Sequence, residues 1–240
     1  MKKLEPNLLF FGCVFVLFFS FSKCFGQQED EIYQYYNTIV GIENTGLFNG
    51  IEYIDNKAVL NDHNKFFIPA SSFTKGWIVY DNQYYPNIKM KYNLVDDRVL
   101  VELGDDNRQS TFQLITAKIK EFGLAGHIFF RLKGNGGVPE GFYEKIYSDG
   151  TRFIYKKLRK KEFRRMDKQY LYYEYFQDKP SYFYVNANDE AFSLNSANDF
   201  IKIFPEKKKS IRKFYREQKI LYKQNLDKFN QMLMTTIVSN

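Results

Sequence analysis

The side chains that could bind a metal or transfer protons are few and widely separated in the chain. His63 and His127 stand 64 residues apart, no HExxH motif is present, and the two cysteines, Cys13 and Cys24, lie near the N-terminus. A zinc site would therefore need Asp or Glu side chains to complete its ligand set. We interpret His63 as an ordinary turn residue and His127 as an ordinary strand-end residue, and we expect no metal and no cofactor.

Paired carboxylates could serve acid–base catalysis or bind Ca²⁺. Asp96-Asp97 and Asp105-Asp106 both stand at predicted turns, where Asp is frequent because its side chain accepts hydrogen bonds from nearby backbone N–H groups. Neither pair has the DxDxDG spacing of a calcium loop. The Gly-rich run at 134–141 lacks the Lys-Ser/Thr of a phosphate-binding loop, and GxSxG is absent. These patterns predict turns and a loop between strands, and no catalytic residue.

The N-terminus has the pattern of a secretory signal peptide. Lys2 and Lys3 precede an apolar run at residues 8–21, which is shorter than the roughly 20 residues that span a membrane. Cys24 and Gly26 are small residues suited to cleavage before Gln27, and Lys23 disfavours lipidation of Cys24. We expect a signal peptide at residues 1–26 that is removed, with a retained membrane anchor as the alternative. The mature chain, residues 27–240, would then be periplasmic, outer-membrane-associated or extracellular.

Basic residues are concentrated in two segments. Residues 155–168 (YKKLRKKEFRRMDK) and residues 206–223 each contain eight Lys or Arg against two acidic residues. Because the net charge of the whole chain is only +7, the rest of the mature chain is net acidic. We expect an anion-contacting surface formed by Lys156, Lys157, Arg159, Lys160, Lys161, Arg164, Arg165, Lys207, Lys208, Lys209, Arg212 and Arg216.

The sequence does not specify the partner of this basic surface. An exported protein seldom meets nucleic acid, and no RRM, OB, KH or helix-turn-helix signature is present, so no nucleic-acid partner is expected. The remaining interpretations are a solvated face, contact with anionic lipid headgroups or acidic glycans, and docking of a basic helix on the acidic body. The segment 155–168 is interpreted as the end of a strand that runs into a basic crossover.

An aromatic run at 170–176 (YLYYEYF) could form a stacking platform or an ordinary strand. Side chains alternate between the faces of a strand. This alternation places Tyr170, Tyr172 and Phe176 on one face and Leu171, Tyr173 and Tyr175 on the other. We favour packing in the core, with one face covered by C-terminal helices.

Turn signals recur about every 10 residues over 73–194, which is typical of an antiparallel meander. Asp81-Asn82, Asp96-Asp97 and Asp149-Gly150 are the predicted hairpin turns. The period then changes, because Ser196 and Asp199 resemble a helix-capping pair and apolar residues follow at helical spacing. We predict a single α+β, β-rich domain over 27–240: an antiparallel meander (sandwich or open barrel) followed by C-terminal helices at about 196–238, which pack on one side of the sheet.

Several segments taken together resemble an uncharacterised family of exported proteins from Bacteroidota-type bacteria. They include FTKGWIVYDNQYY at 73–85, NIKMKYNLVDDRVLV at 87–101, GFYEKIY at 141–147 and FPEKKKSIRKF at 204–214. The resemblance extends over roughly residues 45–235. It implies a Gram-negative host and a location in the periplasm, the outer membrane or the exterior, and it implies no activity and no site residue.

The absence of a catalytic motif, the aromatic strands and the basic segments lead to one functional hypothesis. We expect a non-enzymatic binding or accessory module of the cell envelope, whose partner is an anionic envelope component or an envelope protein. The alternative is a carboxylate-based hydrolase that acts on envelope polymers or glycans, with its carboxylates brought together by the fold. An outer-membrane barrel is a third hypothesis, and charged C-terminal helices fit it poorly.

Overall fold

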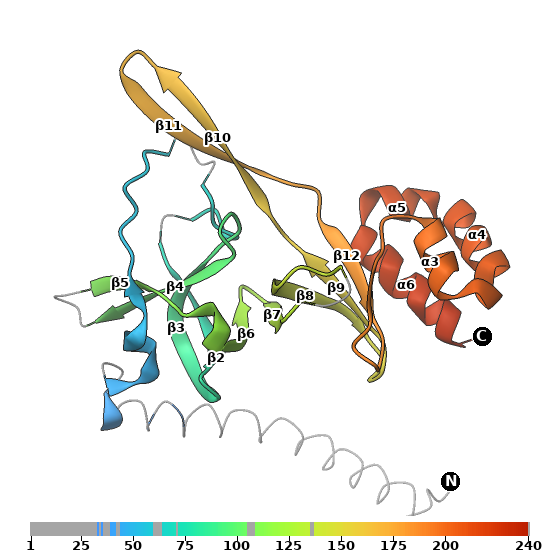
Figure 1. Cartoon of the computed structure of the whole chain (residues 1–240), viewed down its shortest axis with the longest axis horizontal. Helices are drawn as coiled ribbons and strands as arrows, with labels where there is room; N and C mark the ends of the chain where they lie inside the picture. The colour runs from blue at the N-terminus through green and yellow to red at the C-terminus, as the bar shows by residue number, and fades with distance from the viewer. Residues whose placement is uncertain are drawn as a thin grey trace, which may run out of the picture.

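The computed structural model of the chain describes residues 33, 35, 39–41, 44–59, 64–70, 72–104, 109–134 and 137–239. Three features discussed above lie outside these ranges: the predicted signal peptide with both cysteines, His63, and the Asp105-Asp106 pair. The described chain is an α+β protein in which a large antiparallel sheet is followed by C-terminal helices (Figure 1). The predicted fold class is confirmed.

Eleven of the described strands form one open sheet in the order β1-β5-β4-β3-β2-β6-β7-β8-β9-β12-β13, and two form a separate sheet, β10-β11. A sandwich would need two large sheets face to face. The described strands form only one large sheet, so the meander is an open sheet and not a sandwich. The strands are β1 (Ile51–Glu52), β2 (Thr74–Tyr80), β3 (Gln83–Asn93), β4 (Arg98–Gly104), β5 (Gln109–Gln113), β6 (Ile119–Leu124), β7 (His127–Leu132), β8 (Gly141–Ser148), β9 (Phe153–Lys157), β10 (Lys160–Asp167), β11 (Tyr170–Gln177), β12 (Ser181–Val185) and β13 (Ala191–Ser193). Short 3₁₀ turns lie before β1 (Gly46–Asn49) and before β6 (Thr116–Lys118).

The three predicted hairpin turns are present. Asp81 and Asn82 join β2 to β3 with φ angles of 53° and 64°, which a two-residue type I′ turn requires and which Asp and Asn tolerate. Asp96-Asp97 lies between β3 and β4, and Asp149-Gly150 lies between β8 and β9. Local turn chemistry therefore sets the order of these strands.

The sheet curls around an aromatic core. Tyr92 of β3 contacts Phe122 of β6, Phe129 of β7 and Phe142 of β8, with ring centroids 5.2, 5.1 and 5.9 Å apart. Because β2, β6 and β7 separate β3 from β8, a flat sheet would keep these two strands about 19 Å apart. The contact between Tyr92 and Phe142 therefore requires strong curvature in this half of the sheet.

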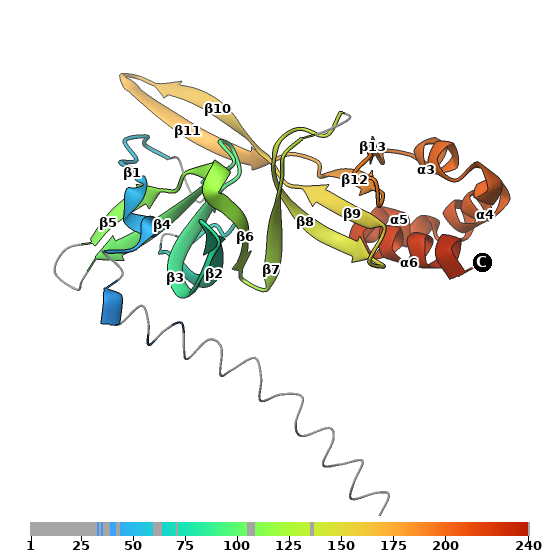
Figure 2. The same ribbon diagram turned by 60° about the horizontal axis from the view of Figure 1, so that its bottom comes forward.

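The other half of the sheet is covered by helices. These are α3 (Ala197–Ile203), α4 (Lys208–Glu217), α5 (Lys219–Gln224) and α6 (Leu226–Ser239), with a 3₁₀ turn at Pro205–Lys207. Ile154 of β9 and Tyr182 of β12 pack in one cluster with Phe229 and Leu233 of α6. The helices gather at one end of the molecule, against β8, β9 and β12 (Figures 1 and 2). The predicted helical region and its packing on the sheet are confirmed.

Candidate functional site

The first basic segment contributes to two sheets. Lys156 and Lys157 end β9, whereas residues 160–167 form β10, which pairs with β11 in an unbroken antiparallel register from Lys160↔Gln177 to Asp167↔Tyr170. The prediction of a basic crossover is therefore wrong. The turn at Lys168-Gln169 contains no Gly or Asn, so the sequence lacked the usual signal for a hairpin turn. Lys168 nevertheless adopts a positive φ of 51°. We call residues 160–177 the arm.

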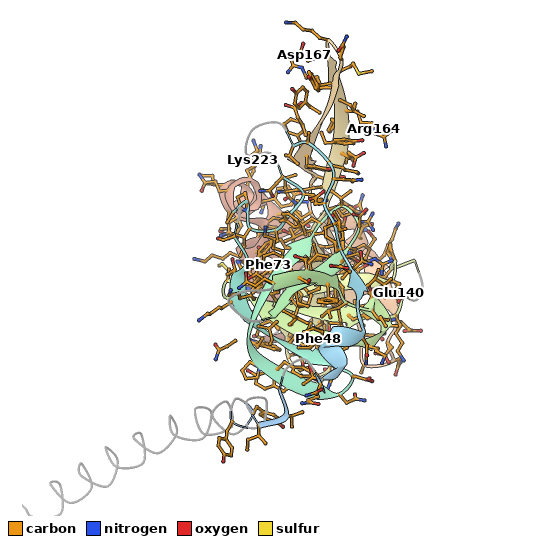
Figure 3. The ribbon with its side chains drawn as sticks, turned by 90° about the vertical axis from the view of Figure 1, so that its left-hand side faces the viewer. Phe48, Phe73, Glu140, Arg164, Asp167 and Lys223 are labelled. Atoms are coloured by element: carbon orange, nitrogen blue, oxygen red, sulfur yellow. The ribbon has the colours of Figure 1, made fainter. Side chains whose placement is uncertain are left out.

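The arm projects from the body of the protein (Figure 1). It leaves the sheet between β9 and β12, and its tip lies far from the C-terminal helices (Figures 1 and 2). Asp167 marks the tip in Figure 3, with Arg164 nearer the body. A two-stranded hairpin is marginally stable alone, so contacts with the body must support the arm at its base.

Three of the predicted anion-contacting lysines are committed to contacts within the protein. Lys157 is only 4% exposed, and its Nζ donates to Asp97 Oδ2 at 2.6 Å and to the Phe142 carbonyl at 3.0 Å. Burial lowers the pKa of Lys157, and the Asp97 carboxylate opposes this shift. The prediction that Lys157 is a surface residue is wrong. The sequence did not reveal its burial because its partner, Asp97, is distant in the chain.

Lys156 and Lys160 are also held by the fold. Lys156 Nζ lies 2.7 Å from Asp227 Oδ2 on α6 and 3.3 Å from Glu144 Oε2 on β8. Lys160 Nζ donates to the carbonyls of Asn64 and Phe66 at 2.8 and 2.7 Å, and burial lowers the pKa of this lysine. These two side chains support the fold instead of forming a free cationic surface.

The other predicted cations of the first segment are exposed. Lys161 pairs with Asp178 at 3.0 Å and Arg164 with Glu162 at 3.1 Å, while Arg159 and Arg165 are exposed in the described structure. Lys168 at the turn is exposed as well and was not predicted as a site residue. The basic surface of this segment therefore lies on the arm and beside its base.

The aromatic strand β11 is not in the core. Tyr175 is buried at 2% exposure, whereas Tyr170, Leu171 and Phe176 are exposed. The C-terminal helices cover β8, β9 and β12 and leave β11 uncovered. The prediction that this strand packs in the core under the helices is therefore wrong, because β11 pairs with β10 outside the large sheet.

The second basic segment forms a surface of its own. Lys208, Lys209, Arg212 and Arg216 are exposed on α4, and Lys207 in the preceding 3₁₀ turn is partly buried. The apolar side of α4 faces the core through the fully buried Ile211. The helices carrying these residues lie at the opposite end of the molecule from the arm tip (Figure 1). The fold thus separates the two basic segments.

A cavity of about 560 Å³ lies beside the β3–β4 turn. Three carboxylates line it, Asp96, Asp97 and Glu140, and all three have partners. Asp97 Oδ1 accepts from the Tyr92 hydroxyl at 2.5 Å, Asp96 accepts from the Asn93 amide at 2.8 Å, and Glu140 pairs with Arg131. Burial raises the pKa of Tyr92 well above its ordinary value, and the Asp97 carboxylate adds to this shift.

His127 begins β7, as predicted, and belongs to a chain of polar contacts that the sequence did not reveal. Its Nδ1 lies 2.6 Å from Glu144 Oε1. Glu144 in turn contacts Lys156, which pairs with Asp227, and Asp227 Oδ1 accepts from the Tyr182 hydroxyl at 2.6 Å. The chain ties β7, β8, β9 and β12 to α6. Within the described residues, no cluster of three His, Cys, Asp or Glu side chains is placed to hold a metal ion.

The comparisons with known proteins add no relative. No family model matches the chain, and neither a curated protein nor a solved structure matches it. In the described part of the chain, every helix is too short or too polar to cross a bilayer. Function must therefore be inferred from the arm, the basic helix and the cavity.

Proposed function

We propose that the protein is a non-enzymatic binding or accessory protein of the cell envelope, which contacts an anionic envelope component through the arm. The observation that supports this proposal is the arm itself, which presents exposed basic and apolar side chains at a distance from the body. Export is part of the proposal and rests on the signal-like segment at residues 1–26 and on the family resemblance.

The charge of the arm is suited to an anionic partner. Between Phe163 and Tyr173 there are three basic residues and one acidic residue, Asp167. Neither Arg165 nor Lys168 forms an ion pair with any residue that the structure describes, so both can offer their full charge to a partner. Attraction between exposed charges is screened beyond about 10 Å at 0.1 M salt. Binding through the arm should therefore weaken as salt is raised.

The test uses the chain from residue 27, which contains every described residue. We expect it to be retained by anionic vesicles and by envelope fractions at low salt and to be released as salt is raised. Replacement of three arm cations, Arg164→Gln, Arg165→Gln and Lys168→Gln, should abolish retention. The control removes the same charge from α4 through Lys208→Gln, Lys209→Gln and Arg212→Gln, and should retain binding. No retention of the unmodified chain at low salt would contradict the proposal, and equal losses in both variants would contradict the role of the arm.

The alternative function is a carboxylate-based hydrolase acting on envelope polymers or glycans, and the cavity beside the β3–β4 turn favours it. Asp97 is held by the buried Lys157, whereas Asp96 and Glu140 are exposed, so these two are the carboxylates best placed to act. The chain would then release soluble fragments from purified envelope polymers, and Asp96→Asn or Glu140→Gln would stop the release. Unchanged release by both variants would exclude this cavity as the site.

A further inference from the structure

We infer that the tip of the arm inserts its apolar side chains into the headgroup region of an anionic lipid bilayer. This inference rests on the proposed function and deepens it, because it names the anionic component as lipid and the mode of contact as insertion. It depends on the distribution of side chains along the arm.

Near its tip, the arm exposes apolar or aromatic side chains on both of its faces. Met166 and Leu171 lie opposite each other and therefore share one face, whereas Tyr170 pairs with Asp167 on the other face. Met166 is 72% exposed, Tyr170 67% and Leu171 41%. Five of the fifteen large hydrophobic side chains exposed in the described structure lie on the arm, so this exposure is concentrated there. Concentrated exposure of this kind marks an interaction surface.

Cationic side chains lie on both sides of the Met166–Leu171 pair along the arm. Arg164 pairs across the arm with Tyr173 and Arg165 pairs with Tyr172, so the two guanidinium groups lie on opposite faces. Lys168 adds a third cation at the turn. Long basic side chains keep their charge at the level of lipid headgroups while their stems lie along apolar surface. Cations on both faces of the arm thus suit an environment that surrounds the tip.

Aromatic side chains come next, toward the base. Phe163 and Phe176 are exposed on one face with ring centroids 5.4 Å apart, and Lys161 lies beside them on the same face. Aromatic rings are favoured at membrane–water interfaces, where an apolar ring meets a polar surrounding. From Met166 and Leu171 toward the base the order is therefore apolar, cationic and aromatic, with Asp167 and Lys168 at the turn end of the arm.

The base and the middle of the arm are anchored to the body. Lys57 forms an ion pair with Glu162, the Tyr173 amide donates to the Ala58 carbonyl at 2.9 Å, and Tyr175 is buried. These contacts reach no further toward the tip than Tyr173. An anchored base with a projecting end can reach into a surface without unfolding.

Lipid fits this distribution better than a protein or a glycan does. A folded partner that covers Met166 and Leu171 leaves Tyr170 on the opposite face in water, whereas the interface of a fluid bilayer surrounds both faces. Glycans are too polar to favour Met166 and Leu171 as contacts. Three cations against one acid complement anionic headgroups, each cation near the surface adding to the attraction.

The first measurement follows the tip directly. In the chain from residue 27, which already contains Trp77, Met166→Trp adds a second indole at the tip, and Ile220→Trp adds one on exposed α5 as the matched control. Vesicles of equal parts phosphatidylcholine and phosphatidylglycerol should shift the emission of the tip probe to shorter wavelength. Lipids with a nitroxide on the upper acyl chain should quench the tip probe. The control probe should show neither effect, since α5 lies at the other end of the molecule.

The second measurement separates insertion from electrostatic adsorption. Met166→Ser with Leu171→Ser removes apolar surface and leaves the charge unchanged. We expect affinity for the same vesicles to fall at least about tenfold, while affinity for dextran sulfate, a soluble polyanion, stays unchanged. Both side chains are exposed, so the variant should keep the thermal unfolding midpoint of the unmodified chain.

The outcomes distinguish this inference from the proposed function. Vesicle binding with no spectral shift and no effect of the serine variant would overturn insertion and leave anionic binding standing. Binding to dextran sulfate or to an envelope protein, without binding to vesicles, would overturn the lipid assignment alone. No binding to any anionic probe at low salt would overturn both.

Discussion

Lys157 Nζ lies 2.6 Å from Asp97 Oδ2, and this contact closes the curl of the sheet. Lys157 ends β9 and Asp97 lies in the β3–β4 turn, so the pair joins strands that the sheet order keeps far apart. The Asp97 carboxylate also accepts from the Tyr92 hydroxyl at 2.5 Å and from the Phe142 amide at 3.2 Å. One carboxylate thus satisfies a buried ammonium, a hydroxyl and an amide at the same place.

The pair predicts a large effect for Asp97→Asn. The change leaves the Lys157 ammonium buried without its counter-charge, and breaking a buried pair in this way costs about 3–5 kcal/mol of unfolding free energy. Chemical denaturation measures the loss. The control is Asp81→Asn, which breaks an exposed pair with Lys118 at a similar φ angle (53° against 56°) and should leave stability nearly unchanged. Equal effects of the two changes would contradict the structural role of the buried pair.

Gly141 stands against the same pair and should not tolerate a side chain. An added Cβ would lie 2.1 Å from Asp97 Oδ2 and 2.5 Å from Lys157 Nζ, at a backbone φ of 147°. Gly150→Ala is the control, because its φ of 93° is also unfavourable but nothing lies within 4 Å of its added Cβ. We expect about 1–3 kcal/mol of strain at Gly150 and a greater loss at Gly141, measured by denaturant unfolding. A smaller loss at Gly141 would show that the pair moves aside freely.

Acid should weaken the anchor of the arm. The hydrogen bond from Lys57 is the main cause that lowers the pKa of Glu162 below its ordinary value of 4.5, with Arg164 adding to it and burial opposing it. A carboxylate whose folded pKa is lowered stabilises the fold fully above its unfolded pKa, and this contribution is lost as pH falls through the folded pKa. At pH 7, Glu162→Gln should cost at most about 1 kcal/mol.

The difference in stability between the parent chain and Glu162→Gln should then disappear as the pH falls below 4.5 and passes the lowered pKa of Glu162. Thermal unfolding of both proteins across this pH range measures it. A difference that does not change with pH would mean that the charge of Glu162 does not anchor the arm.

Phe229 should make a large contribution to the stability of the C-terminal helices. Its fully buried ring lies within 4.8–5.2 Å of the rings of Phe214, Tyr215 and Tyr222, measured between centroids. Phe229→Ala should cost about 3–5 kcal/mol because it leaves a cavity among these rings. Met232 lies on the exposed side of α6, and Met232→Ala should have a small effect. Denaturant unfolding followed by far-ultraviolet circular dichroism measures both, and equal losses would contradict the packing of α6.

The elements that follow local chemistry could be predicted from the sequence. Asp81-Asn82 and Asp149-Gly150 specify hairpins because these residue types suit the turn backbone. Ser196 and Asp199 mark the start of α3, where the Ser196 hydroxyl donates to Asp199 Oδ2 at 3.0 Å. The helical stripe of α6 is amphipathic in sequence and buried in the fold.

The arm could not be predicted in the same way. Its turn at Lys168-Gln169 lacks a Gly or Asn signal, and its strands contain aromatic residues on both faces, which is equally typical of a core strand. The signal that the sequence did contain is a pair of segments of equal length, residues 160–167 and 170–177, that flank a two-residue turn. Whether such a strand is buried depends on which other elements pack against its faces, and no local sequence pattern specifies those elements.

The sequence by itself determined the α+β class, the turns and the helical stripes, because these depend on side chains that are neighbours along the chain. Only the tertiary structure decided which basic residues are buried and which are presented to a partner. Lys157 and Arg165 are eight positions apart in one basic segment, yet a carboxylate 60 positions earlier in the chain holds the first and the second is exposed on the arm. The physical reason is that burial and charge compensation are set by residues distant in sequence that the curl of the sheet brings together.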